Sequence, residues 1–211
     1  GGPPTVKDWN TRYAKAGTEA DTRLFGDQPC EYLREIMARS DFTARSALCL
    51  ADGDGRNGGW LAEQGLAVTA VDASSVATDL ARTHDTARGV TVERIVADLA
   101  AWSPPPGRSW DAVFLMYLQC EAAVRLHAAQ TAAAALAPGG WFVAEGFAPA
   151  GAGGRSLGPE DPDLLYELGD LLDALPELEV MEALKGRIRV NEGLRHRGEA
   201  RIARLLLRKS A

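Results

Sequence analysis

The stretch from Ser46 to Ser74 constrains the fold of this chain more than any other. An apolar run over residues 47–51 breaks into glycines, and a helical segment and a second apolar run that ends on Asp72 follow. This order predicts a βαβ unit of a parallel sheet. Glycines allow a tight turn close to a ligand, and a helix that begins near Asn57 would direct free N–H groups toward it. We therefore expect a nucleotide-like ligand here.

The residues among the glycines indicate the charge of that ligand. Gly53, Gly55 and Gly58 satisfy the dinucleotide pattern G-x-G-x-x-G. Asp52 and Asp54 stand beside them, and each would meet like charge at a pyrophosphate, at a cost of about 4 kcal/mol per pair at 4 Å and an effective dielectric constant of 20. S-adenosylmethionine instead carries a sulfonium and an ammonium next to its ribose. The acidic loop therefore favours S-adenosylmethionine over a nicotinamide dinucleotide.

Two more carboxylates are expected at the same edge of the sheet. Asp72 lies 19 residues after Gly53, at the predicted tip of the second strand, where a carboxylate can accept both hydroxyls of a ribose. Asp98 follows a third predicted strand over residues 90–96 and can accept a hydrogen bond from adenine N6. A helix cap or a turn is the alternative interpretation of Asp98.

The rest of the chain continues the alternation of strands and helices and then departs from it. The expected elements are a helix over 75–84 capped by Ser74 or Ser75, the strand over 90–96, a buried strand over 110–117, a helix over 121–137, a strand over 141–147, a helix over 163–175 and strands over 179–190 and 197–209. The last two have no helix between them and should pair as an antiparallel hairpin. We predict a doubly wound, Rossmann-like α/β sheet of five parallel strands plus this hairpin, with helices on both faces.

The N-terminal segment has two possible functions. Residues 1–39 precede the first strand and would cap the sheet, and residues 5–39 of this segment are predicted to form two helical pieces. Trp9, Arg12 and Tyr13 favour a lid, because aromatic and guanidinium groups can clamp the edge of a ligand. We expect the whole chain, residues 1–211, to be a single domain with this segment as its lid or cap.

The composition argues against several partners. A net charge of −6 disfavours nucleic acid, and no apolar run approaches the roughly 18 residues that cross a membrane. Cys30, Cys49 and Cys120 are odd in number and lack CxxC spacing, which favours a reduced, cytoplasmic protein without a metal site. The sequence does not distinguish a monomer from a homodimer.

Several motifs together resemble those of a known family. The acidic glycine loop, Asp72, Asp98, the PGG at 138–140 and the terminal hairpin resemble class I S-adenosylmethionine-dependent methyltransferases over nearly the whole chain. The small bacterial branch near the tellurite-resistance and the thiol or thiopurine methyltransferases is similar in further motifs, which are GRN at 55–57, VTAVDAS at 68–74, WNTRY at 9–13, LFGDQP at 24–29 and EGLRHRGEA at 192–200.

The resemblance implies a site for S-adenosylmethionine and for a methyl acceptor. The implied cofactor-binding residues are Asp52, Gly53, Asp54, Gly55 and Asn57 in the loop, Asp72 and Ala73 at the ribose, Asp98 and Leu99 at the adenine, and Met116. The implied lid and acceptor pocket consist of Trp9, Arg12, Tyr13, Tyr117 and Gln119. The family usually has an acidic residue near Cys49 and a glycine near Ala51, so we expect Asp52 or Asp54 to supply the carboxylate from a shifted position.

The expected reaction is methyl transfer to a small-molecule acceptor by in-line displacement at the sulfonium. The acceptor stays open between a thiol, a chalcogen oxyanion and another small nucleophile, and a base is needed only if it is not already an anion. The family resemblance singles out His196 as that base, with a surface turn as the alternative. His84 is expected at a helix end, and His127 is expected to be structural or exposed. A few arginines near His196 could hold an anionic acceptor.

Two other functions are compatible with the pattern. A non-catalytic regulator that binds S-adenosylmethionine would keep the loop and Asp72 but would need no acceptor pocket. An NAD-dependent oxidoreductase would keep the glycines but would favour a neutral loop.

Overall fold

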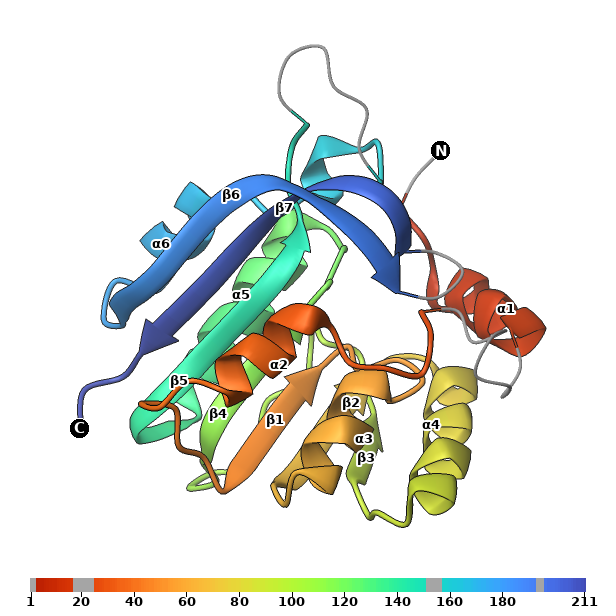
Figure 1. Cartoon of the computed structure of the whole chain (residues 1–211), viewed down its shortest axis with the longest axis horizontal. Helices are drawn as coiled ribbons and strands as arrows, with labels where there is room; N and C mark the ends of the chain where they lie inside the picture. Colours follow the sequence, from red (N-terminus) through yellow and green to blue (C-terminus); the bar gives the residue numbers. More distant parts are fainter. Residues whose placement is uncertain (1–2, 17–24, 151–156, 193–195) are drawn as a thin grey trace.

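The computed structural model describes residues 3–16, 25–150, 157–192 and 196–211, and at residues 16, 190–192, 196 and 197 it describes only the backbone. One seven-stranded sheet has the order β3-β2-β1-β4-β5-β7-β6 and carries helices on both faces (Figure 1). Its strands are β1 (Ser46–Leu50), β2 (Ala67–Asp72), β3 (Glu93–Val96), β4 (Trp110–Met116), β5 (Leu136–Phe147), β6 (Glu179–Glu192) and β7 (His196–Arg208). The helices are α1 (Val6–Ala16), α2 (Glu31–Met37), α3 (Arg56–Glu63), α4 (Ser75–Arg88), α5 (Ala122–Ala134), the 3₁₀ turn η1 (Pro162–Leu164) and α6 (Leu168–Ala174).

The pairing of the strands confirms the predicted sheet. Strands β1 to β5 pair in parallel, whereas β7 pairs antiparallel with both β5 and β6. The chain builds outward from β1 to β2 and β3, then crosses back to place β4 on the other side of β1. The carboxyl ends of β1 and β4 therefore meet where the winding direction reverses, which is where ligands bind in open α/β sheets.

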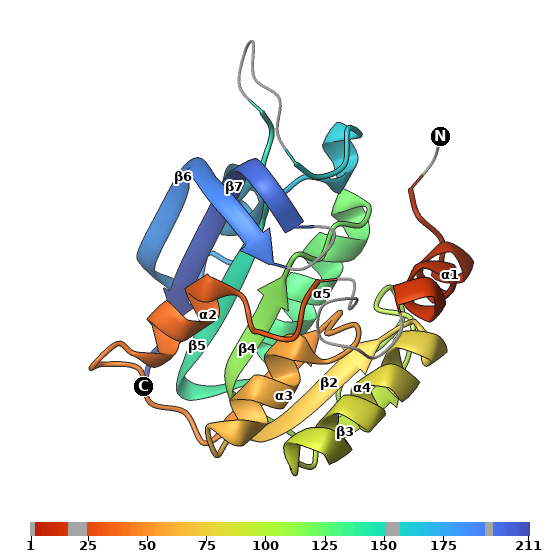
Figure 2. The ribbon, with the colours of Figure 1, turned by 45° about the vertical axis from the view of Figure 1, so that its right-hand side comes forward.

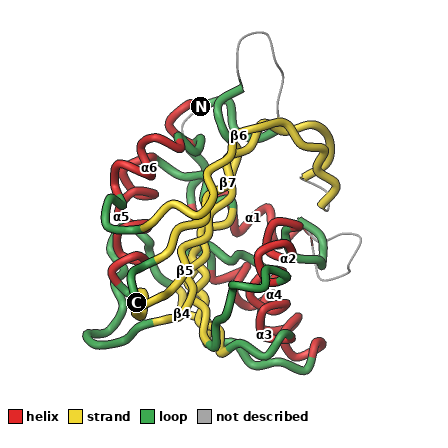
Figure 3. Tube along the Cα trace, turned by 60° about the vertical axis from the view of Figure 1, so that its left-hand side comes forward, coloured by secondary structure: helices red, strands yellow, loops and turns green. Residues whose placement is uncertain are grey.

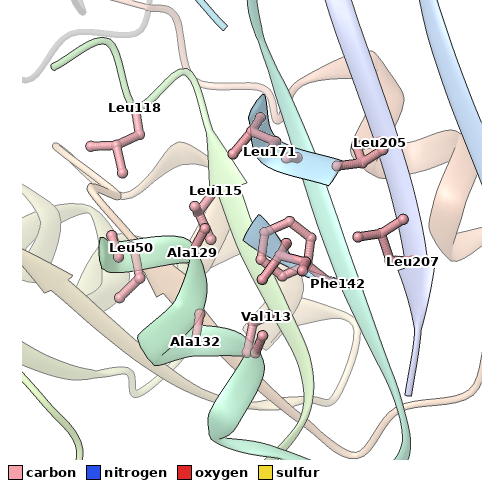
Figure 4. Packing of buried hydrophobic residues seen from close by; sticks show 14 of the residues in the cluster. Leu50, Val113, Leu115, Leu118, Ala129, Ala132, Phe142, Leu171, Leu205 and Leu207 are labelled. Carbon is pink, nitrogen blue, oxygen red and sulfur yellow. The ribbon is translucent and has the colours of Figure 1, made fainter. Parts of the chain in front are cut away.

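The central strands of the sheet are buried on both faces. Figure 3 shows α5 and α6 on one side of it and α2, α3 and α4 on the other. Along β4, Val113 and Leu115 point into the core under α5 and α6 (Figure 4), whereas Phe114 and Met116 point into the core under α2 and α3. Because successive side chains of a strand alternate between its faces, a strand buried on both sides has the continuous apolar sequence on which its prediction was based.

Two predicted helix boundaries were wrong. The alanine-rich helix ends at Ala134, because Leu136 already pairs with Trp110 and begins β5, which includes the Pro-Gly-Gly turn. Helix α4 continues to Arg88 and ends at Gly89 in the left-handed conformation, so His84 lies inside the helix and not at its end.

Two further elements are shorter than predicted. Strand β3 begins at Glu93 and not at residue 90. The helix predicted over 163–175 is split into η1 and α6 by an extended segment that begins at Leu165. Within the described part of the chain, no helix has the length and apolar character needed to span a bilayer.

Candidate functional site

A cavity of about 540 Å³ opens at the carboxyl ends of β1, β2 and β4, where the winding direction of the sheet reverses. Thirteen of the sixteen predicted site residues line it, which are Trp9, Arg12, Tyr13, Asp52, Asp54, Asn57, Asp72, Ala73, Asp98, Leu99, Met116, Tyr117 and Gln119. Gly53 and Gly55 belong to the loop beneath but are not among the lining residues. The side chain of His196 lies outside the described residues, although its backbone begins β7.

Three backbone N–H groups of the glycine loop and the first turn of α3 donate hydrogen bonds to acceptors within the protein. The N–H of Gly53 donates to Asp72 Oδ2 (2.8 Å), that of Gly55 to the carbonyl of Asp52 (3.0 Å) and that of Gly58 to Asp52 Oδ1 (3.0 Å). The expectation that the start of the following helix offers free N–H groups is therefore wrong for Gly58. A pyrophosphate would find these three donors occupied, which disfavours a dinucleotide at this loop.

A buried ion cluster lies under the loop. Arg94 of β3 donates from Nη1 to Asp52 Oδ2 (2.9 Å) and from Nε and Nη2 to both carboxylate oxygens of Asp85 (2.7 and 2.9 Å). The side chains of Arg94 and Asp52 are 3% and 2% exposed. Burial raises the pKa of the Asp52 carboxyl, and the ion pair with Arg94 opposes that rise. With one oxygen on Arg94 and the other on Gly58, Asp52 faces the loop interior more than the cavity.

Asp72 occupies the predicted position at the tip of β2. Its Oδ2 accepts from Gly53 and its Oδ1 accepts from the N–H of Ser74, both at 2.8 Å. Burial raises its pKa, while these two hydrogen bonds act in the opposite direction. Ser74 in turn caps α4, because its Oγ accepts from the N–H of Ala77 at 3.0 Å, as predicted. Asp98 differs from Asp72, since it is exposed and accepts from the N–H of Ala100.

Helix α1 covers the loop from outside and lies beside α4 (Figure 2). Tyr13 is buried and its hydroxyl stands over Gly53, where an added Cβ atom would lie 2.2 Å from Tyr13 Oη. Trp9 and Phe25 pack around Tyr13 with ring centroids 6.0 and 6.4 Å from it. Asn10 accepts a hydrogen bond from the Ser74 hydroxyl, which ties α1 to the residues after Asp72. This arrangement agrees with a lid but also places Tyr13 in a packed contact.

The far half of the cavity is built at the ends of β4 and β5. Tyr117 donates its hydroxyl to Glu145 Oε1 (2.7 Å), and Arg204 of β7 donates to Glu145 Oε2 (2.6 Å). Gln119 accepts from the N–H of Phe147 (2.8 Å) and donates to the carbonyl of Leu164. Both polar ends of Gln119 are therefore occupied, and its position is that of a strut between β5 and η1.

Two residues at this edge have backbones in the left-handed region. Ala51 directly follows β1 with φ 60°, and Tyr117 directly follows β4 with φ 57°. Each conformation costs about 1 to 2 kcal/mol for a residue with a Cβ atom. Both lie at the reversal point and line the cavity, which is where backbone strain usually accompanies function.

Two buried side chains fix the wall of the far half. Tyr166 accepts from the N–H of Leu118 (2.7 Å) and donates to the carbonyl of Leu115 (2.9 Å). Arg125 of α5 donates to the carbonyls of Cys120 (2.7 Å) and Leu165 (2.6 Å). These bonds hold the segment after β4 against the segment around η1, so this wall is rigid.

Neither of the two histidines with described side chains lines the cavity. His127 is exposed on α5. His84 is buried in α4, where its Nδ1 lies 2.9 Å from the carbonyl of Asp54 and its Nε2 has no hydrogen-bond partner. Among the described residues no group of three or more His, Cys, Asp or Glu side chains is arranged to hold a metal ion.

A comparison with protein-family models finds a match in the central part of the chain. Residues 47–140, from β1 to the turn within β5, match the model described as a methyltransferase domain. Residues 47–140 are a methyltransferase domain. No curated protein sequence matches the chain.

Solved structures share the fold of this methyltransferase domain and its flanking elements. A protein from echinomycin biosynthesis, concerned with the conversion of a disulfide bond into a thioacetal group, is 18% identical over 97% of this chain and 91% of its own, with a TM-score of 0.70. TehB from Haemophilus influenzae is 14% identical over 85% of this chain and 62% of its own, with a TM-score of 0.68. The [4+2]-cyclase SpnF is 16% identical over 86% of this chain and 80% of its own, with a TM-score of 0.66.

These comparisons bear on the predictions from sequence. The family match confirms the predicted methyltransferase, an enzyme with S-adenosylmethionine as its cofactor, and the shared fold confirms the predicted class I sheet, which TehB also has. The acceptor is not identified by them. The assignment of individual site residues also rests on the cavity and its chemistry alone.

Sequence reasoning missed residues that act through others. Glu145 is the single charged residue of the apolar strand β5, a signal that predicts a buried ion pair but not its partner, whereas Arg94 stands beside Glu93 in the short strand β3 and gives no such signal. Phe25, Ser74, Phe147 and Leu164 line the cavity, but ordinary packing explains such residues equally well from sequence.

Proposed function

We propose that this protein transfers the methyl group of S-adenosylmethionine to a small, largely apolar molecule whose acceptor atom is a soft nucleophile such as a thiol sulfur. One observation carries the proposal, which is the distribution of side chains in the cavity lining: Asp52, Asp54, Asp72 and Asp98 stand near the ends of β1, β2 and β3, whereas the lining near the ends of β4 and β5 is mainly apolar, with Glu121 as its carboxylate. The first part suits a cationic cofactor with a ribose, and the second suits an acceptor with a mainly apolar body.

The carboxylate half would hold the cofactor. Asp54, Asp72 and Asp98 line the cavity near the ends of β1, β2 and β3, whereas the described guanidinium groups that line it are those of Arg12 and Arg56. A cationic sulfonium and ammonium would be favoured by this balance. Within the loop, Asp52 and Asp54 both line the cavity and are the candidate carboxylates for the ammonium.

Asp72 would bind the ribose without losing its present contacts. Each of its oxygens accepts one backbone N–H, and a carboxylate oxygen has a second lone pair. Two ribose hydroxyls can therefore be accepted by the same group. Leu99 is buried and lines the cavity next to Asp98, so this pair would flank the adenine from an apolar and a polar side.

The apolar half would hold the acceptor. Phe147, Leu164, Val124 and Met116 line it together with the ring of Tyr117. The cofactor supplies the electrophilic methyl carbon, and the chain supplies orientation and exclusion of water, of which orientation alone can contribute up to about 7 to 11 kcal/mol. Trp9 and Tyr13 of α1 would close the cavity and form the lid of a single domain, with residues 1–39 covering the sheet.

The chemistry of the lining favours an acceptor that ionises easily. No described histidine side chain lines the cavity, and burial raises the pKa of Cys120 to about 11, which leaves that thiol a poor base. A small thiol loses its proton near pH 8.5 with little help, unlike an alcohol. The neighbour from echinomycin biosynthesis, which is concerned with a sulfur group, supports sulfur as the acceptor atom.

His196 remains the proposed base for acceptors that stay neutral. Three residues after it, Glu199 accepts from the N–H of Leu157, next to cavity-lining Gly158. The start of β7 is thus close to the acceptor half. We propose that His196 removes the acceptor proton and that the protein works as a monomer or homodimer in the cytoplasm, with no nucleic acid or membrane partner.

The test is a methyl-transfer assay with labelled S-adenosylmethionine. The panel pairs neutral aliphatic and aromatic thiols with carboxylated thiols of the same size, and adds phenols, amines, selenite and tellurite. We expect labelled product and S-adenosylhomocysteine with the neutral thiols, and at least about tenfold lower kcat/KM with the carboxylated ones. Preference for the oxyanions or the carboxylated thiols would refute the apolar acceptor.

A second candidate function, binding of S-adenosylmethionine without methyl transfer, is tested by the same assay. SpnF shares this fold and is a [4+2]-cyclase, so the fold alone does not fix the reaction. A protein that binds S-adenosylmethionine without consuming it would release no S-adenosylhomocysteine with any acceptor. The apolar half of the cavity and its rigid wall favour catalysis over such binding alone.

A further inference from the structure

We infer that Arg94 is a positioning residue for the cofactor, which shapes the glycine loop by clamping Asp52 from below and does not line the cavity itself. This role rests on the proposed cofactor site at the loop. Arg94 is absent from the cavity lining, whereas Asp52, Asp54 and Arg56 of the loop are part of it.

The clamp joins three elements of the fold. Arg94 projects from β3, Asp85 holds two of its nitrogens from α4, and Asp52 holds the third from the loop after β1. The bidentate pair with Asp85 fixes the plane of the guanidinium, so Nη1 has one direction available toward Asp52. The single charge of a lysine could not fill both roles with this geometry.

Two motif glycines make room for this clamp. A Cβ atom on Gly55 would lie 2.5 Å from Arg94 Nη2, and one on Gly58 would lie 2.4 Å from Asp52 Oδ2. The glycine pattern that resembles a dinucleotide motif is thus explained here by close approach of side chains from within the protein. Approach of a ligand from outside is not needed to explain either residue.

Loss of the clamp would reach the cavity through the loop. Asp52 accepts from the N–H groups of Gly55 and Gly58, one through its carbonyl and one through Oδ1. Without Arg94 its carboxylate would be buried and unpaired, and it would have to take up a proton or turn toward water. Turning toward water would break the bond to Gly58 and shift Asp54, which lines the cavity.

The charge state of Asp52 decides between these outcomes. The titratable groups that face it are Arg94 of β3, Asp85 of α4, Asp72 of β2, Cys49 of β1 and Tyr13 of α1. Arg94 is the cation among these groups, and it lowers a pKa that burial raises. Its removal leaves Asp52 protonated and in place at low pH. As pH rises through the raised pKa, Asp52 ionises and the loop opens.

The experiment measures the Kd of S-adenosylhomocysteine by calorimetry between about pH 6 and pH 9. For wild type we expect a nearly constant Kd. For Arg94→Met we expect a Kd raised at least about tenfold at the upper end of the range and much less at the lower end. The Kd of Arg94→Lys should lie between those of wild type and Arg94→Met. Arg39→Met is the control, since Arg39 pairs with Asp41 on the surface and lines no part of the cavity.

Two double variants separate positioning from loss of stability. Asp52→Asn in the Arg94→Met background removes the unpaired charge at the loop and should restore the Kd to within about threefold, with no pH dependence. Asp85→Asn in the same background removes a charge of the same cluster on α4, and it should leave the Kd raised. If Arg94→Met does not fold, as judged by circular dichroism, the Kd values of Arg94→Lys and of the double variants test the proposal instead.

The proposal is overturned if Arg94→Met binds like wild type at every pH. It is also overturned if its loss of affinity is independent of pH, or if Asp85→Asn restores affinity as well as Asp52→Asn does. Failure of the wild type to bind S-adenosylhomocysteine would instead refute the proposed cofactor site.

Discussion

Asp72 gives the sharpest test of the cofactor half, because its removal should affect stability and binding together. In Asp72→Ala the N–H groups of Gly53 and Ser74 lose a charged acceptor, and both lie at the edge of the cavity. An unsatisfied donor costs about 1 to 3 kcal/mol, so the two together cost about 2 to 6 kcal/mol of folding stability if water reaches neither. The proposed ribose contacts add about 1.5 to 3 kcal/mol per bond to the loss of binding.

Asp98 is the matched control for this experiment. It also lies just after a strand, but it is exposed, and among the described hydrogen bonds its carboxylate accepts only from the N–H of Ala100. Urea unfolding should show a large loss of stability for Asp72→Ala and a change within about 1 kcal/mol for Asp98→Ala. Calorimetry with S-adenosylhomocysteine should show a larger rise in Kd for Asp72→Ala than for Asp98→Ala. Equal Kd values for wild type and Asp72→Ala would remove Asp72 from the site.

Three further predictions concern the acceptor half and the lid. Deletion of residues 1–20 should leave the far-ultraviolet circular dichroism of the sheet intact but abolish methyl transfer and weaken cofactor binding, and full activity of the truncated protein would reduce Tyr13 to a packing residue. Gln119→Ala should raise the KM of the acceptor about tenfold while the Kd of the cofactor stays unchanged, because Gln119 braces Phe147 in the far wall only. His196→Ala should lower turnover of a neutral acceptor more than that of one already ionised, and an equal loss for both would exclude His196 as the base.

The sequence by itself determined the order of the elements and the place of the site. Hydrophobic periodicity is a local property, so the βαβ unit around Gly53, the buried strand that ends at Met116 and the terminal hairpin could be read from neighbouring residues. The place of Asp72 could also be predicted from within the βαβ unit. Asp72 lies 19 residues after Gly53, at the tip of the second strand, and accepts a hydrogen bond from the N–H of Gly53.

The tertiary structure alone decided which counter-charge meets a buried carboxylate. Asp52 and Asp54 are equivalent in sequence and both line the cavity, yet the fold brings Arg94, 42 residues after Asp52, against the carboxylate of Asp52. Gln119 lines the cavity, where the acceptor pocket was predicted, and the fold also brings the N–H of Phe147 and the carbonyl of Leu164 to its amide group. Partners of this kind come together only when distant strands pair, and a buried charge finds its counter-charge through space and not through sequence.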